Sequence, residues 1–270
     1  MTVEGVRLRI GDAAPHGHEV PGTAVHTVTR PYVQGMVTIE KTTDDFRIDS
    51  VKAFISEKSF PCVGAKSALN KNRMRVLQFG DMAGTGATKK LWKELIKYSH
   101  EYPDPGSVPV SFVAVFDNVE TSETNEIDFE NLLWRQLQAL HDFDCDNGIV
   151  WDKKVSRDPT KSDFSFSIGG RAFFVVGLHP GSSRMSRRMP FPCIVFNFHD
   201  QFESLKLSGK YTGMQDAIRT RDITLQGNVN PVLARFGESS EAIQYSGRAV
   251  GSDWKCPFQA RQAMEGAMHE

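Results

Sequence analysis

Val108–Phe116 has the sequence VPVSFVAVF, and this stretch decides the fold that we expect for the chain. β-Branched and aromatic residues follow one another there almost without a break, whereas a strand with one face in water alternates apolar and polar residues. The stretch therefore predicts a central strand that is buried on both faces. Such a strand needs further strands beside it and helices over both of its faces.

Amphipathic helices are expected on either side of this strand in the sequence. Thr85–His100 places Leu91 and Leu95 on an apolar stripe opposite its lysines, and Asp128–Asp144 has a similar apolar side that begins at Phe129. Apolar residues spaced in this way predict helices that cover a sheet. The same kind of pattern predicts three further helices, at Phe46–Glu57 with Phe46 facing inward, at Asp200–Leu207 and at Tyr211–Leu225.

Four other strands are expected, one before the helix at Thr85–His100 and three after the helix at Asp128–Asp144. Gly169–Gly170 lies between two of them and predicts a tight hairpin. The expected strands are Arg73–Phe79, Asp163–Ile168, Arg171–Leu178 and Pro192–Phe198. This order of elements predicts an α+β fold, with a mostly antiparallel sheet covered by helices in a single domain. The segment Phe60–Gly64 is expected to be a turn.

The N-terminal residues differ in composition from the rest of the chain. Residues 1–43 are rich in Gly, Pro, Thr and His, and they are expected to form an irregular arm with a short extended piece at Met36–Glu40. Residues 44–270 are expected to form the single main domain. Met1–Gly22 contains no apolar segment of the kind that signal peptides carry.

Composition narrows the classes of function. The net charge of −1 argues against non-specific binding to nucleic acid or to a membrane surface, which needs an excess of basic residues. No stretch approaches the roughly 20 apolar residues of a membrane helix. The four cysteines are widely spaced, which is typical of reduced thiols and predicts a cytoplasmic protein.

Arginines, histidines and aromatic residues gather between Gly177 and Phe258. Such arginines could bind phosphates, carboxylates or haem propionates, or they could pair with nearby surface acids. His179 and His199 each follow an apolar run, so each could coordinate a metal or serve only the structure. The other candidates for metal ligands are His100, His141, Cys193 and Cys256.

Several long stretches resemble the YqcI/YcgG family over about Asp44–Phe258. They are FPCVGAKSAL at Phe60–Leu69, VVGLHPGSSRMSRR at Val175–Arg188, FNFHDQFESL at Phe196–Leu205, IRTRDITLQGNVNPVL at Ile218–Leu233 and SEAIQYSGRAVGSDWKCPF at Ser240–Phe258. The branch that the chain resembles most contains haem-dependent guanidine N-hydroxylases of guanitoxin biosynthesis and the L-arginine hydroxylase of the D-cycloserine pathway. The resemblance implies haem b as cofactor and hydroxylation of L-arginine to Nω-hydroxy-L-arginine, with O₂ or peroxide and an electron donor.

The resemblance also suggests roles for individual residues. His179 is the first choice as axial ligand of the iron and His199 the second, and Arg184 and Arg187 are expected to hold the haem propionates. The candidates to bind the substrate guanidinium are Glu203 and Asp222, also expected to be catalytic, and Glu238 and Glu241; Lys66 and Arg248 are the candidates for its α-carboxylate. A haem carrier or sensor without turnover and a metal-free binding protein are the alternatives. A homodimer remains open.

Overall fold

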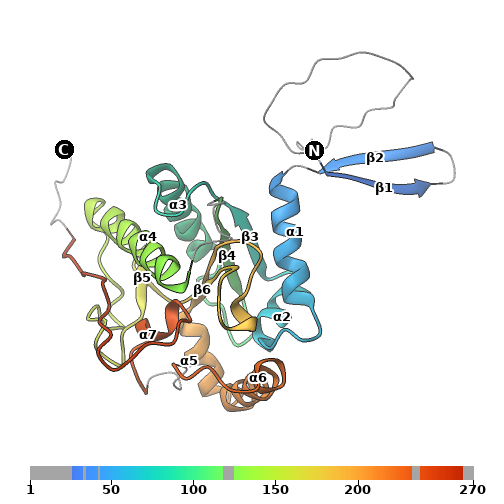
Figure 1. The fold of residues 1–270 in the computed structure, drawn as a ribbon. Helices are drawn as coiled ribbons and strands as arrows, with labels where there is room; N and C mark the ends of the chain where they lie inside the picture. The colour runs from blue at the N-terminus through green and yellow to red at the C-terminus, as the bar shows by residue number, and fades with distance from the viewer. Residues whose placement is uncertain (1–25, 33–34, 42, 118–124, 233–237, 264–270) are drawn as a thin grey trace, which may run out of the picture.

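The computed structural model describes residues 26–32, 35–41, 43–117, 125–232 and 238–263 (Figure 1). Strands β1 (His26–Tyr32) and β2 (Gly35–Lys41) pair antiparallel as a separate two-stranded sheet. The expected extended piece at residues 36–40 therefore lies within β2, whereas β1 was not predicted. The rest of the expected arm, residues 1–25 above all, lies outside the described residues.

The main sheet has five strands in the order β3-β4-β7-β6-β5. Only β3 and β4 run parallel, and the other three pairs are antiparallel. The strands are β3 (Met74–Gln78), β4 (Ser111–Val115), β5 (Phe166–Ile168), β6 (Arg171–Leu178) and β7 (Cys193–Phe198). The prediction of a mostly antiparallel sheet in an α+β domain is confirmed.

The central position of β4 agrees with its sequence. All five of its residues are buried. Phe112 and Ala114 belong to the apolar cluster on one face of the sheet, whereas Val113 and Val115 belong to the cluster on the other. Because neither face meets water, every position of the strand can be apolar or small.

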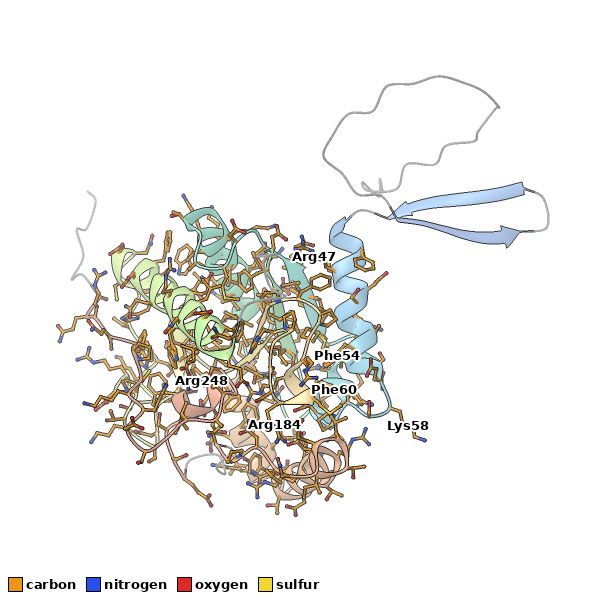
Figure 2. All side chains as sticks on the ribbon, viewed as in Figure 1. Arg47, Phe54, Lys58, Phe60, Arg184 and Arg248 are labelled. Carbon is orange, nitrogen blue, oxygen red and sulfur yellow. The ribbon has the colours of Figure 1, made fainter. Side chains whose placement is uncertain are left out.

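Four helices lie over one face of the sheet, which we call the α1 face. They are α1 (Thr43–Ser56), α2 (Val63–Asn70), α5 (His199–Leu207) and α6 (Tyr211–Gln226). Near the end of α1, Phe54 packs edge to face against Phe60, with ring centroids 5.4 Å apart (Figure 2). Phe46 was expected to face inward, but it is 42% exposed. Helix α2 was not predicted, because its N-terminus falls in the expected turn.

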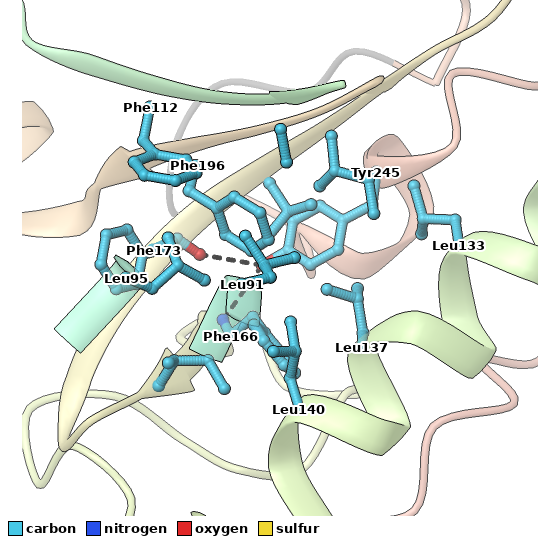
Figure 3. Close-up of a cluster of buried hydrophobic side chains, with 14 of the residues drawn as sticks. Leu91, Leu95, Phe112, Leu133, Leu137, Leu140, Phe166, Phe173, Phe196 and Tyr245 are labelled. Carbon is cyan, nitrogen blue, oxygen red and sulfur yellow. Dashed lines mark hydrogen bonds between the residues drawn. The ribbon is translucent and has the colours of Figure 1, made fainter. Parts of the chain in front are cut away.

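Helices α3 (Thr85–Glu101) and α4 (Glu126–Asp146) cover the opposite face, which we call the α4 face (Figure 1). Leu133 and Leu137 of α4 point toward Tyr245 in the largest apolar cluster (Figure 3). Tyr245 belongs to the short helix α7 (Ala242–Tyr245), and its hydroxyl accepts a hydrogen bond from the Phe166 amide at 3.1 Å. This bond links α7 to the sheet, although the segment after residue 227 was expected to be irregular.

The hairpin and the helix starts follow their local sequence. Gly169 and Gly170 join β5 to β6 with φ of +62° and +73°, a conformation that side chains disfavour. The side chain of Asn125 caps α4 by accepting hydrogen bonds from the amides of Ile127 and Asp128. Among the helices of the described ranges, none is long and apolar enough to cross a membrane.

Candidate functional site

An apolar cavity of about 270 Å³ lies between the α1 face of the sheet and the helices that cover it. The sheet contributes side chains of four strands, including Met74, Val113, Val176 and Val195. Its other walls come from α2, α5 and α6 and from the segments near them, and they include Phe60, Cys62, Phe202, Leu205, Met214, Ile218 and Asp222. Such a mostly apolar site with a few polar groups is typical of pockets for small molecules and cofactors.

Asp222 is the buried carboxylate of this apolar cavity. Its Oδ2 accepts a hydrogen bond from Arg184 Nη2 at 2.5 Å, and the two side chains are only 6% and 8% exposed. Its Oδ1 is buried without a hydrogen-bond partner. Because a buried acceptor without a partner is costly, this oxygen is suited to receive a donor from a ligand.

Arg187 lines the same cavity and is fixed by backbone groups. Its Nη1 donates to the carbonyls of Gly177 and Tyr245, and its Nη2 donates to that of Gln244. Burial lowers the pKa of Arg187 to about 10, so the guanidinium keeps its charge near neutral pH. The positive charges of Arg184 and Arg187 therefore exceed the single negative charge of Asp222, which leaves this group of three side chains with a net positive charge.

Cys62 is a feature of this site whose role was not predicted. It occupies the N-cap of α2 and lines the apolar cavity, and its Sγ accepts a hydrogen bond from the Ala65 amide at 3.4 Å. Burial raises the pKa of the thiol, while the amides of Ala65 and Gly64 and the charge of Arg187 lower it. The sequence signal that could have drawn attention to this cysteine is Phe60-Pro61-Cys62, which lies directly before α2.

His179 lies on the α4 face of the sheet, away from the apolar cavity. Side chains alternate along β6, so Phe174, Val176 and Leu178 line the cavity. The ring of His179 stacks on Phe129 of α4, with centroids 4.2 Å apart, and its Nδ1 has no hydrogen-bond partner. Burial lowers its pKa to about 4, so the imidazole is neutral at pH 7.

His199 and Glu241 line a separate pocket of about 400 Å³, which we call the acidic pocket. His199 Nδ1 lies 3.7 Å from Glu241 Oε1, and Glu203 lies at the same pocket. Glu241 also accepts hydrogen bonds from Ser165 Oγ and Tyr245 Oη. Burial raises the pKa of Glu241 to about 8 and lowers that of His199, which favours the neutral form of both groups.

The remaining predicted residues lie apart from both pockets. Lys66 Nζ donates to the Glu57 and Lys58 carbonyls at the periphery, where Figure 2 labels Lys58. Arg248 forms an ion pair with Glu130 of α4. Glu238 is exposed. The structure thus brings together Arg184, Arg187 and Asp222 at one site and His199, Glu203 and Glu241 at another.

Metal-binding clusters and disulfides are absent from the part of the chain that the structure describes. No group of three or more histidine, cysteine or acidic side chains there could hold a metal ion. All four cysteines are free. Of the described residues that line the apolar cavity, one is a cysteine and none is a histidine.

Comparison with known proteins gives consistent results. Residues 51–259 match the model of the YqcI/YcgG family. The uncharacterized protein YcgG of Bacillus subtilis (strain 168) is 28% identical over 208 residues, which are 74% of this chain and 81% of that protein. The uncharacterized protein YqcI of the same strain is 25% identical over 223 residues, or 80% and 86%. No solved structure matches. Since the family match covers most of its length, the chain belongs to the YqcI/YcgG family.

Proposed function

We propose that the chain binds haem b in the apolar cavity and hydroxylates a guanidine nitrogen of L-arginine, giving Nω-hydroxy-L-arginine. The resemblance of its motif stretches to haem-dependent guanidine hydroxylases suggests this reaction. The observation that carries the proposal is the Oδ1 of Asp222, a buried acceptor without a partner in an apolar cavity. A guanidinium offers planar N–H donors to such a carboxylate.

The chemistry of the cavity lining agrees with a haem, whereas its volume of about 270 Å³ is below the roughly 300–1,000 Å³ of ligand pockets, so haem binding would require the walls to move apart. The apolar walls match the porphyrin ring, and the excess positive charge of Arg184 and Arg187 favours its propionates. Arg219 adds a third guanidinium to the lining. Cys62 supplies a soft donor atom. Haem supplies the activation of oxygen that a poorly nucleophilic guanidinium requires.

The chain's own groups would bind and orient the substrate. Asp222 Oδ1 would accept from the guanidinium, while Arg184 keeps the other carboxylate oxygen in place. The apolar surroundings strengthen this contact, because the charges interact with little screening by water. Arg219 is suited to the α-carboxylate of the substrate, since Lys66 and Arg248 lie outside the cavity.

Spectroscopy of the haem-loaded protein tests the proposal. Adding L-arginine to the full chain reconstituted with haemin should shift the Soret band, and mass spectrometry should detect hydroxyarginine with peroxide or with a reductant and O₂. Asp222→Asn should weaken arginine binding by at least about 30-fold, because losing a buried charge partner costs about 2 kcal/mol or more. Asp216→Asn is the matched control, since Asp216 is exposed on the same helix.

Each other outcome points to a different function. Haem uptake without a spectral shift and without product would favour a haem carrier or sensor. A protein that takes up no haemin would contradict every haem-dependent function and favour a metal-free binding protein. Arginine binding that Asp222→Asn leaves unchanged would place the substrate elsewhere, and the acidic pocket would then be the next site to test.

A further inference from the structure

We infer that the acidic pocket is a second binding site, and that it takes a small organic cation that carries ammonium or guanidinium groups and no carboxylate. This inference goes beyond the proposed function, because it needs neither haem nor the apolar cavity. It starts from the charges that line the acidic pocket and from one oxygen of Glu241.

The acidic pocket has room for a small molecule and an excess of negative charge. Its volume of about 400 Å³ lies within the roughly 300–1,000 Å³ of ligand pockets. Carboxyl side chains outnumber lysines in its lining, with Asp152, Asp163, Asp200, Glu203 and Glu241 on one side of the count and Lys154 and Lys206 on the other. A pocket lined mainly by one sign of charge attracts a ligand of the opposite sign.

Ion pairs neutralise only part of this charge. Asp200 pairs with Arg171 at 3.0 Å, and Glu203 lies 3.6 Å from Lys206. Asp152 accepts hydrogen bonds from two backbone amides, which carry no net charge. The pocket therefore keeps negative charge that a bound cation would offset, whereas a ligand with a carboxylate would add to it.

Glu241 presents a buried oxygen at this pocket. Its side chain is 3% exposed, and its Oε2 accepts hydrogen bonds from Ser165 Oγ at 2.9 Å and Tyr245 Oη at 3.2 Å. Its Oε1 accepts no hydrogen bond from the described residues, since His199 Nδ1 is too far away at 3.7 Å. A buried acceptor without a donor is costly, so this oxygen is suited to an N–H group of a ligand.

The protonation of Glu241 gives cation binding a pH dependence that can be measured. Burial raises its pKa to about 8, although hydrogen bonds from Ser165 and Tyr245 oppose this shift. A cation beside Oε1 favours the carboxylate, so binding near neutral pH would release a proton. The other titratable or charged side chains around Glu241 are those of Asp152, Lys154, Asp163, His199, Asp200, Glu203, Lys206 and Tyr245. Burial lowers the pKa of His199, so this imidazole stays neutral at and above neutral pH.

Titration calorimetry on the purified full chain, with and without haemin, tests the inference with agmatine, which carries an ammonium and a guanidinium group but no carboxylate. The wild-type protein should bind agmatine and release a proton to the buffer, and its affinity should rise by up to about tenfold per pH unit below the pKa of Glu241. L-Arginine should bind this pocket more weakly, and the dicarboxylate succinate should not bind.

Glu241→Gln provides the decisive comparison. At about pH 9, where wild-type Glu241 is ionised, the variant should bind agmatine at least about 30-fold more weakly, because a buried charge partner is lost. Its remaining affinity should no longer rise with pH. Glu57→Gln is the matched control, since it makes the same change at an exposed residue outside the pocket. Thermal unfolding verifies that each variant folds. If Glu241→Gln does not, Asp163→Asn at an exposed carboxylate of the same lining replaces it and should weaken binding by about two- to fivefold.

The outcomes separate this site from the proposed function. A wild-type protein that binds no agmatine, or equal affinities of wild type and Glu241→Gln, would overturn the inference. Binding that is lost in Asp222→Asn and kept in Glu241→Gln would also overturn it, because the cation would then lie in the apolar cavity. Agmatine binding that depends on Glu241 would support the inference even if no hydroxyarginine forms, a result that counts against the proposed function alone.

Discussion

The Asp222→Asn variant should lower the stability of the protein through the ion pair that it breaks. Asp222 and Arg184 are 6% and 8% exposed, so the guanidinium that remains is buried without its counter-charge. Removing one partner of a buried pair costs about 3–5 kcal/mol. We expect the lower end, because Arg184 still donates to the side chain and the carbonyl of Asn228. Arg187 is a second buried cation that interacts with Asp222. The substitution removes this attraction too, so we do not expect a loss of stability below this range.

Urea unfolding followed by circular dichroism measures this loss. With a denaturant slope of about 3 kcal/mol per M, a loss of 3 kcal/mol lowers the midpoint by about 1 M. The variant should still fold, since domains are typically stable by about 5–15 kcal/mol. Asp142→Asn is the control, because Asp142 and Arg261 are 35% and 49% exposed and such pairs contribute about 0–1 kcal/mol. Equal midpoint shifts in the two variants would refute the argument from burial.

Three further substitutions test other parts of the structure. Gly177→Ala should cost about 1–3 kcal/mol in urea unfolding, because its Cβ would lie 2.6 Å from Leu133 and 2.7 Å from Phe129; an unchanged midpoint would contradict this packing. Gly227→Ala should cost about 1 kcal/mol, since Gly227 ends α6 with φ of +85° in open space, and a gain in stability would disprove that conformation. Burial raises the pKa of Glu241 from 4.5 to about 8, so the folded state binds more protons between these values. The free energy of unfolding of wild type relative to Glu241→Gln should therefore fall as the pH rises through this range, and a flat difference would argue against a buried carboxyl.

Much of the fold could be predicted, because it follows from local patterns. The helix predicted at residues 85–100 is α3 at residues 85–101, and β4 is buried on both faces as its composition indicates. The short helix α2 lacked the usual signals, since its N-cap is a cysteine and its first turn has no acidic residue. Phe46 fits an apolar stripe by spacing, but it lies near the exposed start of its helix.

The candidate site was less accessible to sequence reasoning. Arg184, Arg187 and Asp222 were singled out, and the structure places them together. The alternation along β6 separates His179 from Leu178, but a period of two does not tell which face of the sheet carries a cavity. Cys62 and Asp222 line the same cavity because α2 packs against α6. No local sequence pattern predicts this packing.

Helix α6 gives the apolar cavity a wall of low intrinsic stability. Of its sixteen residues only Asp222 is buried, and the other hydrogen bonds that hold the helix, such as those from Arg221 to the Lys58 and Phe60 carbonyls, lie nearer the surface. Amides in α6 should therefore exchange with deuterium faster than those of α3 and α4, which bury five and ten residues. A ligand that engages Asp222 would act on the buried contact of this helix, so ligand entry into the cavity and opening of α6 would be coupled through this side chain.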